Sequence, residues 1–239
     1  MGIDLSRSKS LFGRDWDRCA REMGHRLRSL GMTLIVRGPG SDHPLGALDA
    51  FVVEQVRTCH ERAIAAAMHY GAERYVVRLD GTTGRPRSER MARAEATSRM
   101  LEQLAVAARA RGMELGVEQH LEHDPDALEG LVETLGRIGA GLIYSPALAV
   151  CSEVDDVAGG FELCRPVIIG LDLTDRLPRD LEPRAPGSGV LDRVDSLASM
   201  MNAEEVGFFT LDVPRTKTAE AVEGLNGLAR RVAVGPELA

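Results

Sequence analysis

Charged side chains stand at the ends of short apolar stretches of this sequence. Glu118 and His120 lie at the end of the stretch that begins at residue 113, and Asp172 ends the stretch that begins at residue 166. A carboxylate or an imidazole can act as a general base and take a proton from a carbon atom next to a carbonyl group. These residue types therefore predict proton transfer on a small polar substrate, with Glu118, His120 and Asp172 as candidate catalytic residues.

The apolar stretches themselves indicate how these residues are positioned. They cover residues 32–37, 74–80, 113–120, 141–145, 166–172 and 207–212. Strands that alternate with helices form a parallel sheet, and barrel enzymes of this type carry their chemistry at the carboxyl ends of the strands. Because a closed barrel needs eight strand–helix units and about seven can be counted here, we predict an α/β fold, a (β/α) TIM-type barrel that is incomplete.

Helix-like sequence separates the predicted strands. Helices are expected over residues 15–30, 48–70, 88–111, 125–138, 191–201 and 219–231, with a weaker one around 154–163. Gly31, Gly71 and Gly112 follow three of them, and glycine is the usual residue at a helix end. Residues 174–189 are polar and rich in Pro, Arg and Gly, which predicts a long loop.

Length, charge and hydropathy limit the possible functions. The chain has 239 residues, which suits one barrel domain over residues 1–239, and its formal net charge is −7. Nucleic-acid binding needs a basic surface, so a nucleic-acid partner is not expected. Neither a signal peptide nor an apolar run of the roughly 20 residues that a membrane span requires is present. We therefore predict a cytoplasmic protein with a small-molecule substrate, and four free cysteines.

Several short motifs occur in the order found in one known family. The runs GIDLS (2–6), VRGPG (36–40), GAERYVV (71–77), GVEQH (116–120) and LDLTD (171–175) resemble strand motifs of the xylose-isomerase-like barrel superfamily. The Gly-Ser-Gly run at 187–189 is similar to a loop of that family. The superfamily includes sugar phosphate isomerases and epimerases and the family-2 apurinic endonucleases. Endonuclease activity is disfavoured here by the acidic charge.

The resemblance also implies how the barrel begins. The first motif resembles the family's second strand, so the first strand and helix are expected to be missing. Open strand edges are normally covered or paired with another chain. We therefore predict a homodimer.

The resemblance implies a divalent metal held by carboxylates and histidines, but the expected ligand set is degenerate. Glu118 falls at the family's metal-binding glutamate. Arg37 stands where the family has a histidine, and a second family histidine falls at Arg78 or Leu79. Asp172 and Asp212 replace a histidine and a glutamate. The carboxylates of Glu118, Asp172 and Asp212 could hold Mg²⁺ or Mn²⁺ through oxygen atoms.

The two arginines favour a site without metal. A guanidinium repels a metal ion, whereas Arg37 and Arg78 could bind a carboxylate or phosphate of the substrate. In that case Glu118 or Asp172 would be the general base, and His120 a base or its positioning partner. The cofactor is accordingly predicted as none or a divalent metal. A defunct barrel with internal salt bridges is a further alternative.

Other polar residues complete the predicted site. Tyr144 could donate a proton from the end of its strand, although a core tyrosine is equally plausible. Ser145 is a candidate substrate-binding residue. Gly187 and Gly189 could offer backbone N–H groups to a phosphate together with Arg176, while a plain turn is the alternative.

Three functions are compatible with these features. The first is an isomerase or epimerase that acts on a small, anionic carbonyl or sugar-type substrate by proton abstraction. The second is a metal-independent lyase, dehydratase or cyclase of specialised metabolism. The third is a non-catalytic protein that binds a ligand or a partner protein.

Overall fold

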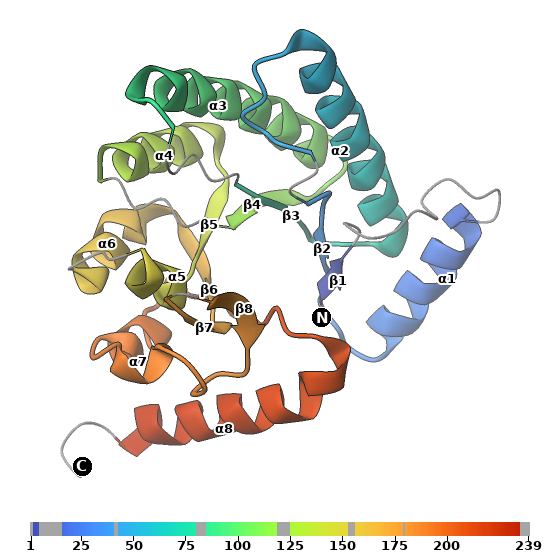
Figure 1. Cartoon of the computed structure of the whole chain (residues 1–239). Coiled ribbons are helices and arrows are strands. Elements are labelled where there is room, and N and C mark those ends of the chain that lie inside the picture. The colour runs from blue at the N-terminus through green and yellow to red at the C-terminus, as the bar shows by residue number, and fades with distance from the viewer. Residues whose placement is uncertain are drawn as a thin grey trace. The chain divides into compact units, whose positions relative to one another are not determined.

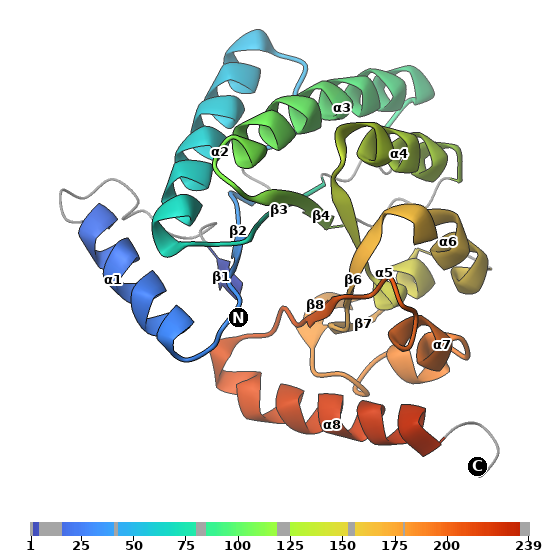
Figure 2. The same ribbon diagram turned by 180° about the vertical axis from the view of Figure 1, so that it is seen from behind.

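The computed structural model describes residues 2–4, 16–40, 43–79, 85–118, 125–152, 156–178 and 180–234. The chain divides into two compact units, residues 1–120 with 133–141 and residues 121–132 with 142–239. Strands and helices alternate along the sequence in both (Figures 1 and 2). The helix α4 (Pro125–Ile138) has residues in each unit.

The first unit is a parallel sheet with helices between its strands. Its elements are β1 (Gly2–Asp4), α1 (Trp16–Ser29), β2 (Ile35–Arg37), α2 (Ala50–Tyr70), β3 (Arg74–Arg78), α3 (Arg87–Arg109) and β4 (Glu114–Glu118). Each strand pairs in parallel with the next one along the chain. Helices α2 and α3 pack against each other, and α3 packs on β4 (Figures 1 and 2).

The helices of this unit end where the sequence predicts. The side chain of Asp49 accepts hydrogen bonds from the N–H groups of Phe51 and Val52 and so caps the start of α2. Gly71 has a φ of 72° and closes the same helix, and Gly31 and Gly112 have φ values of 71° and 73°. Only glycine adopts this left-handed conformation without cost, so these three residues turn the chain from a helix into the next strand.

The second unit holds a shorter parallel sheet. It consists of β5 (Gly141–Tyr144), β6 (Ile168–Asp172) and β9 (Phe208–Thr210), which pair in that order. Its helical elements are α5 (Pro146–Cys151), α6 (Val157–Cys164), η1 (Arg165–Val167), η2 (Leu191–Arg193), α7 (Leu197–Met201), η3 (Arg215–Lys217) and α8 (Thr218–Val234).

Two sequence predictions for this unit are wrong. The segment expected to be a loop contains a hairpin of two antiparallel strands, β7 (Asp175–Leu177) and β8 (Asp180–Arg184). The helix expected over residues 191–201 is interrupted, because Val194 is extended between η2 and α7. Both errors concern short elements that are held by tertiary contacts and lack a clear periodic pattern.

Apolar side chains between strands and helices form the core of each unit. Leu34, Ile64, Leu104 and Leu115 are fully buried in the first unit, and Leu142, Ile143 and Leu171 in the second. All four cysteines are free; Cys164 is buried, Cys59 and Cys151 are half-buried and Cys19 is exposed. In the described part of the chain no helix is long and apolar enough to span a membrane.

Candidate functional site

Two arginine side chains bracket the carboxylate of Glu118 at the carboxyl edge of the first unit's sheet. The Nε atom of Arg37 donates to Oε1 at 2.9 Å, and Nη2 of the same guanidinium also contacts Oε1. The Nε atom of Arg78 donates to Oε2 at 3.1 Å. The Glu118 side chain is 9% exposed, whereas those of Arg37 and Arg78 are 20% and 37% exposed. A buried carboxylate thus fixes two guanidinium groups that solvent can reach.

Strand register brings these three residues together. Arg78 is paired directly with Glu118, and Arg37 lies on β2, opposite Val76 of β3. Residues two apart in a strand point to the same face, so Arg78 and Val76 share the face that Arg37 and Glu118 occupy. All three are among the predicted site residues, and in the structure both arginines contact Glu118.

The residues around Glu118 do not fit a divalent metal. Both of its carboxylate oxygens are engaged by guanidinium groups, and two positive charges a few ångströms away repel a cation. Within the described ranges, no group of three or more His, Cys, Asp and Glu side chains could hold a metal ion. His120, the other candidate on this strand, lies outside the described residues. Asp172 and Asp212 belong to the second unit, so a site shared with Glu118 stays a prediction.

Asp172 is the centre of a second polar cluster, at the carboxyl end of β6. Its Oδ1 atom accepts hydrogen bonds from the backbone N–H of Thr174 at 3.1 Å and from the Thr174 hydroxyl at 2.5 Å. Its Oδ2 atom accepts one from the Ser145 hydroxyl at 3.3 Å. The backbone N–H of Asp212 donates to Thr174 Oγ1 at 2.6 Å. Thr174 and Ser145 are buried.

This cluster unites three predicted residues and one that the sequence analysis missed. Ser145 and Asp172 are in contact, and Asp212 joins them through its backbone. Thr174 was not predicted, although it stands two residues after an aspartate. An aspartate that accepts a hydrogen bond from the backbone two residues on is a common turn, and this spacing was the available signal.

Tyr144 is placed differently from the predicted proton donor. Its hydroxyl donates to the backbone carbonyl of Val157 at 3.0 Å, and its ring packs edge-on against Phe161 with a centroid distance of 5.6 Å. The side chain is buried, and burial raises the pKa of its hydroxyl. These contacts favour the alternative of a core tyrosine.

The Gly-Ser-Gly loop is organised by a buried carboxylate. The backbone N–H groups of Gly187 and Gly189 donate to Asp175 Oδ2 at 2.9 and 2.8 Å, and those of Arg176 and Leu191 donate to Oδ1 at 2.9 and 3.1 Å. Asp175 is completely buried and Arg176 is 8% exposed. Because the glycine N–H groups already have an acceptor, the contacts favour the plain turn over a phosphate site.

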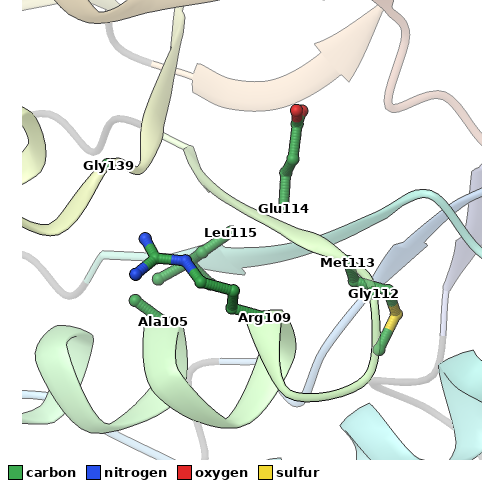
Figure 3. Close-up of a pocket in the computed structure, with 7 residues that line it drawn as sticks. All are labelled: Ala105, Arg109, Gly112, Met113, Glu114, Leu115 and Gly139. Atoms are coloured by element: carbon green, nitrogen blue, oxygen red, sulfur yellow. The ribbon is translucent and has the colours of Figure 1, made fainter.

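A cavity of about 220 Å³ lies at the opposite end of β4 from Glu118 (Figure 3). It is lined by the end of α3, the Gly112–Met113 turn and Gly139. Glu114 points away from Arg109 in this view, and it forms an ion pair with Arg74 at 2.9 Å. The amino ends of barrel strands serve stability, and the lining brings no acid–base pair together.

A buried imidazole lies beside the strand that carries Arg37. The Nδ1 atom of His60 is 2.8 Å from the hydroxyl of Tyr75, and both side chains are buried. Burial, assisted by the charge of His43, lowers the pKa of His60 to about 4. A Cβ atom on Gly38 would lie 2.1 Å from the Tyr75 hydroxyl, so this glycine permits the close approach of the chain after Arg37.

Comparisons with known proteins agree with this architecture. A family model described as a xylose isomerase-like TIM barrel matches residues 2–231. A D-tagatose 3-epimerase-like protein superposes with a TM-score of 0.79 and 16% identity, over 98% of this chain and 88% of that chain. D-psicose 3-epimerase in the presence of D-fructose superposes with a TM-score of 0.67 and 13% identity, over 93% of this chain and 78% of that chain. The IOLI protein with a bound zinc atom superposes with a TM-score of 0.69 and 14% identity, over 97% of this chain and 87% of that chain.

No curated protein sequence matches this one. The family match and the superpositions confirm the predicted α/β TIM-type barrel class. The described strands amount to four parallel strands in the first unit and three in the second, in agreement with the predicted incomplete barrel.

Proposed function

We propose that this chain, which belongs to the xylose isomerase-like TIM barrel family, is an isomerase or epimerase of a small anionic carbonyl or sugar-type substrate. The names of two neighbours, a D-tagatose 3-epimerase-like protein and D-psicose 3-epimerase, support the reaction class. The cluster of Arg37, Arg78 and Glu118 carries the proposal that the substrate is anionic.

The arginines are suited to bind a carboxylate or phosphate group. A guanidinium presents its N–H donors in a planar fork that matches both anions. Arg37 and Arg78 are held by ion pairs with Glu118, so little side-chain freedom is lost when a ligand binds. The same positive charge would stabilise the negative charge that develops on a carbonyl oxygen during proton abstraction.

Asp172 is a better candidate for the general base than Glu118. Two guanidinium groups favour the charged form of Glu118 and therefore oppose its protonation. The Oδ2 atom of Asp172 contacts only the Ser145 hydroxyl, at 3.3 Å, among the described residues. In this proposal Asp172 removes a proton from the carbon next to the carbonyl group, and the C–H electrons move to form an enediolate.

Return of the proton completes the reaction. Return of the proton from Asp172 to the neighbouring carbon isomerises the substrate, whereas epimerisation takes a proton from solvent on the opposite face of the original carbon and leaves the first proton on Asp172. No step of this scheme passes through a metal, because the residues around Glu118 do not fit one. The contact of both guanidiniums with Glu118 equally supports the second candidate, a metal-independent lyase, dehydratase or cyclase. A non-catalytic binding protein is the third.

Exchange of substrate hydrogen for solvent deuterium tests the proposal. Sugar phosphates, sugar acids and their uncharged counterparts would be incubated with the protein in D₂O and followed by NMR. We expect exchange at the carbon next to the carbonyl group for an anionic substrate, and a loss of at least about tenfold in kcat/KM with Arg37→Met or Arg78→Met. Full activity of both variants would contradict the proposal.

A matched arginine serves as the control. Arg99 forms an exposed ion pair with Glu95 on α3, so Arg99→Met removes a guanidinium without touching this cluster. We expect it to leave kcat/KM unchanged. The predicted homodimer and cytoplasmic location remain predictions, which sedimentation analysis and cell fractionation would check.

A further inference from the structure

We infer that Thr174 is a positioning residue that leaves Oδ2 of Asp172 as the oxygen that takes the substrate proton. This inference rests on the proposed function, because it assigns an atom to the proton transfer proposed for Asp172. It is carried by the hydrogen bonds of four residues, Asp172, Thr174, Asp212 and Ser145.

The orientation of the Thr174 hydroxyl is fixed by its two partners. A hydroxyl has one hydrogen to donate and two lone pairs that accept. The backbone N–H of Asp212 occupies one lone pair at 2.6 Å, since an amide can only donate. The hydroxyl hydrogen therefore points at Asp172 Oδ1, which lies 2.5 Å away. Thr174 is completely buried, so water does not compete for either contact.

This arrangement makes the two oxygens of Asp172 unequal. Oδ1 accepts both the hydroxyl and the backbone N–H of Thr174. A proton on Oδ1 would face these two donor hydrogens, whereas among the described residues Oδ2 accepts a single, longer hydrogen bond, from the Ser145 hydroxyl at 3.3 Å. Oδ2 is thus the oxygen on which a new O–H bond forms when the substrate C–H bond breaks. The two hydrogen bonds from Thr174 hold the carboxylate plane in that orientation.

Neutron diffraction tests the assignment without any substrate. Deuterated crystals of the full chain, equilibrated at acidic pH until Asp172 is protonated, would show the deuteron directly. We expect it on Oδ2, with the Thr174 deuteron directed at Oδ1. A deuteron on Oδ1 would overturn the inference.

Kinetics then separates positioning from a structural role. With a substrate found by the deuterium assay, Thr174→Val should lower kcat at least about tenfold with KM nearly unchanged, because the hydrogen bond from the hydroxyl to the charged Asp172 is lost while the backbone N–H bond stays. Thr174→Ser keeps the hydroxyl and should restore most of kcat. The control is Thr134→Val, which removes a part-buried hydroxyl that is hydrogen-bonded to Ser98, away from Asp172 in the sequence and in the other unit.

The outcomes distinguish the two claims. Equal loss in Thr174→Val and Thr174→Ser, or an effect on KM alone, would overturn the role of Thr174. Absence of turnover by the unmodified protein on every tested substrate would instead count against the proposed function. In that case the diffraction experiment still decides which oxygen of Asp172 takes a proton.

Discussion

Acidification should destabilise this protein through one buried histidine, His60. Its imidazole is 1% exposed and lies 2.8 Å from the Tyr75 hydroxyl. Burial, with a smaller contribution from the charge of His43, lowers its pKa from 6.5 to about 4. Charging the ring in the folded state therefore costs more than charging it in the unfolded chain.

The sign and size of the effect follow from that difference. Between pH 6.5 and pH 4 the unfolded chain binds a proton at His60 that the folded protein does not. The stabilisation is therefore fully present above pH 6.5 and is lost as the pH falls toward 4. The shift corresponds to about 3 kcal/mol in the free energy of unfolding. For a chain of this size that is a decrease of roughly 10 °C in Tm.

Urea unfolding at a series of pH values measures this contribution. His60→Gln can still bond to Tyr75 but does not titrate, so its free energy of unfolding should fall by about 3 kcal/mol less between pH 7 and pH 4. His25→Gln, which removes an exposed histidine of α1, is the matched control and should keep the original slope. The reasoning is refuted if the His60 variant and the unmodified protein lose the same stability on acidification.

Two further substitutions, Gly189→Ala and Tyr144→Phe, test the packing around the predicted site, and Gly130→Ala is a control. Gly189→Ala should destabilise the protein by roughly 2 to 4 kcal/mol, since its Cβ atom would lie 2.3 Å from the Arg176 carbonyl oxygen. Gly130 lies on α4 with open space around it, so Gly130→Ala should be neutral or stabilising by up to about 1 kcal/mol in urea unfolding. Equal changes in the free energy of unfolding for the two glycine variants would contradict this account. Tyr144→Phe loses the hydrogen bond to Val157 and should cost about 1 kcal/mol with kcat unchanged. A large fall in kcat would restore Tyr144 as a proton donor.

Most of the strands and helices of the first unit could be predicted from the sequence. Apolar stretches, the glycine helix ends and the polar strand ends are local signals, and they predict that Arg78 and Glu118 lie at one edge of the sheet. The contact between them depends on strand register, which spacing alone does not reveal. Arg37 reaches the same carboxylate from the next strand but one.

The second unit was less predictable because its polar contacts involve loop residues, whose partners are not set by the register of neighbouring strands. Thr174 acquires its role from Asp212, 38 residues later in the chain. The Asp175 carboxylate accepts hydrogen bonds from backbone N–H groups of a loop that begins 12 residues further on. Neither contact follows from the periodicity of apolar residues. The short β7–β8 hairpin also lacks an alternating apolar pattern.

Metal and anion titration of the purified protein tests the central claim most directly. Calorimetric titration with Mn²⁺, Mg²⁺ and Zn²⁺, together with elemental analysis, would be carried out on the unmodified protein and on Glu118→Ala. Inorganic phosphate would be titrated separately into the unmodified protein and into Arg37→Met. The account predicts no stoichiometric metal at Glu118 and a phosphate binding heat that Arg37→Met abolishes. Near-stoichiometric metal that disappears in Glu118→Ala would contradict it.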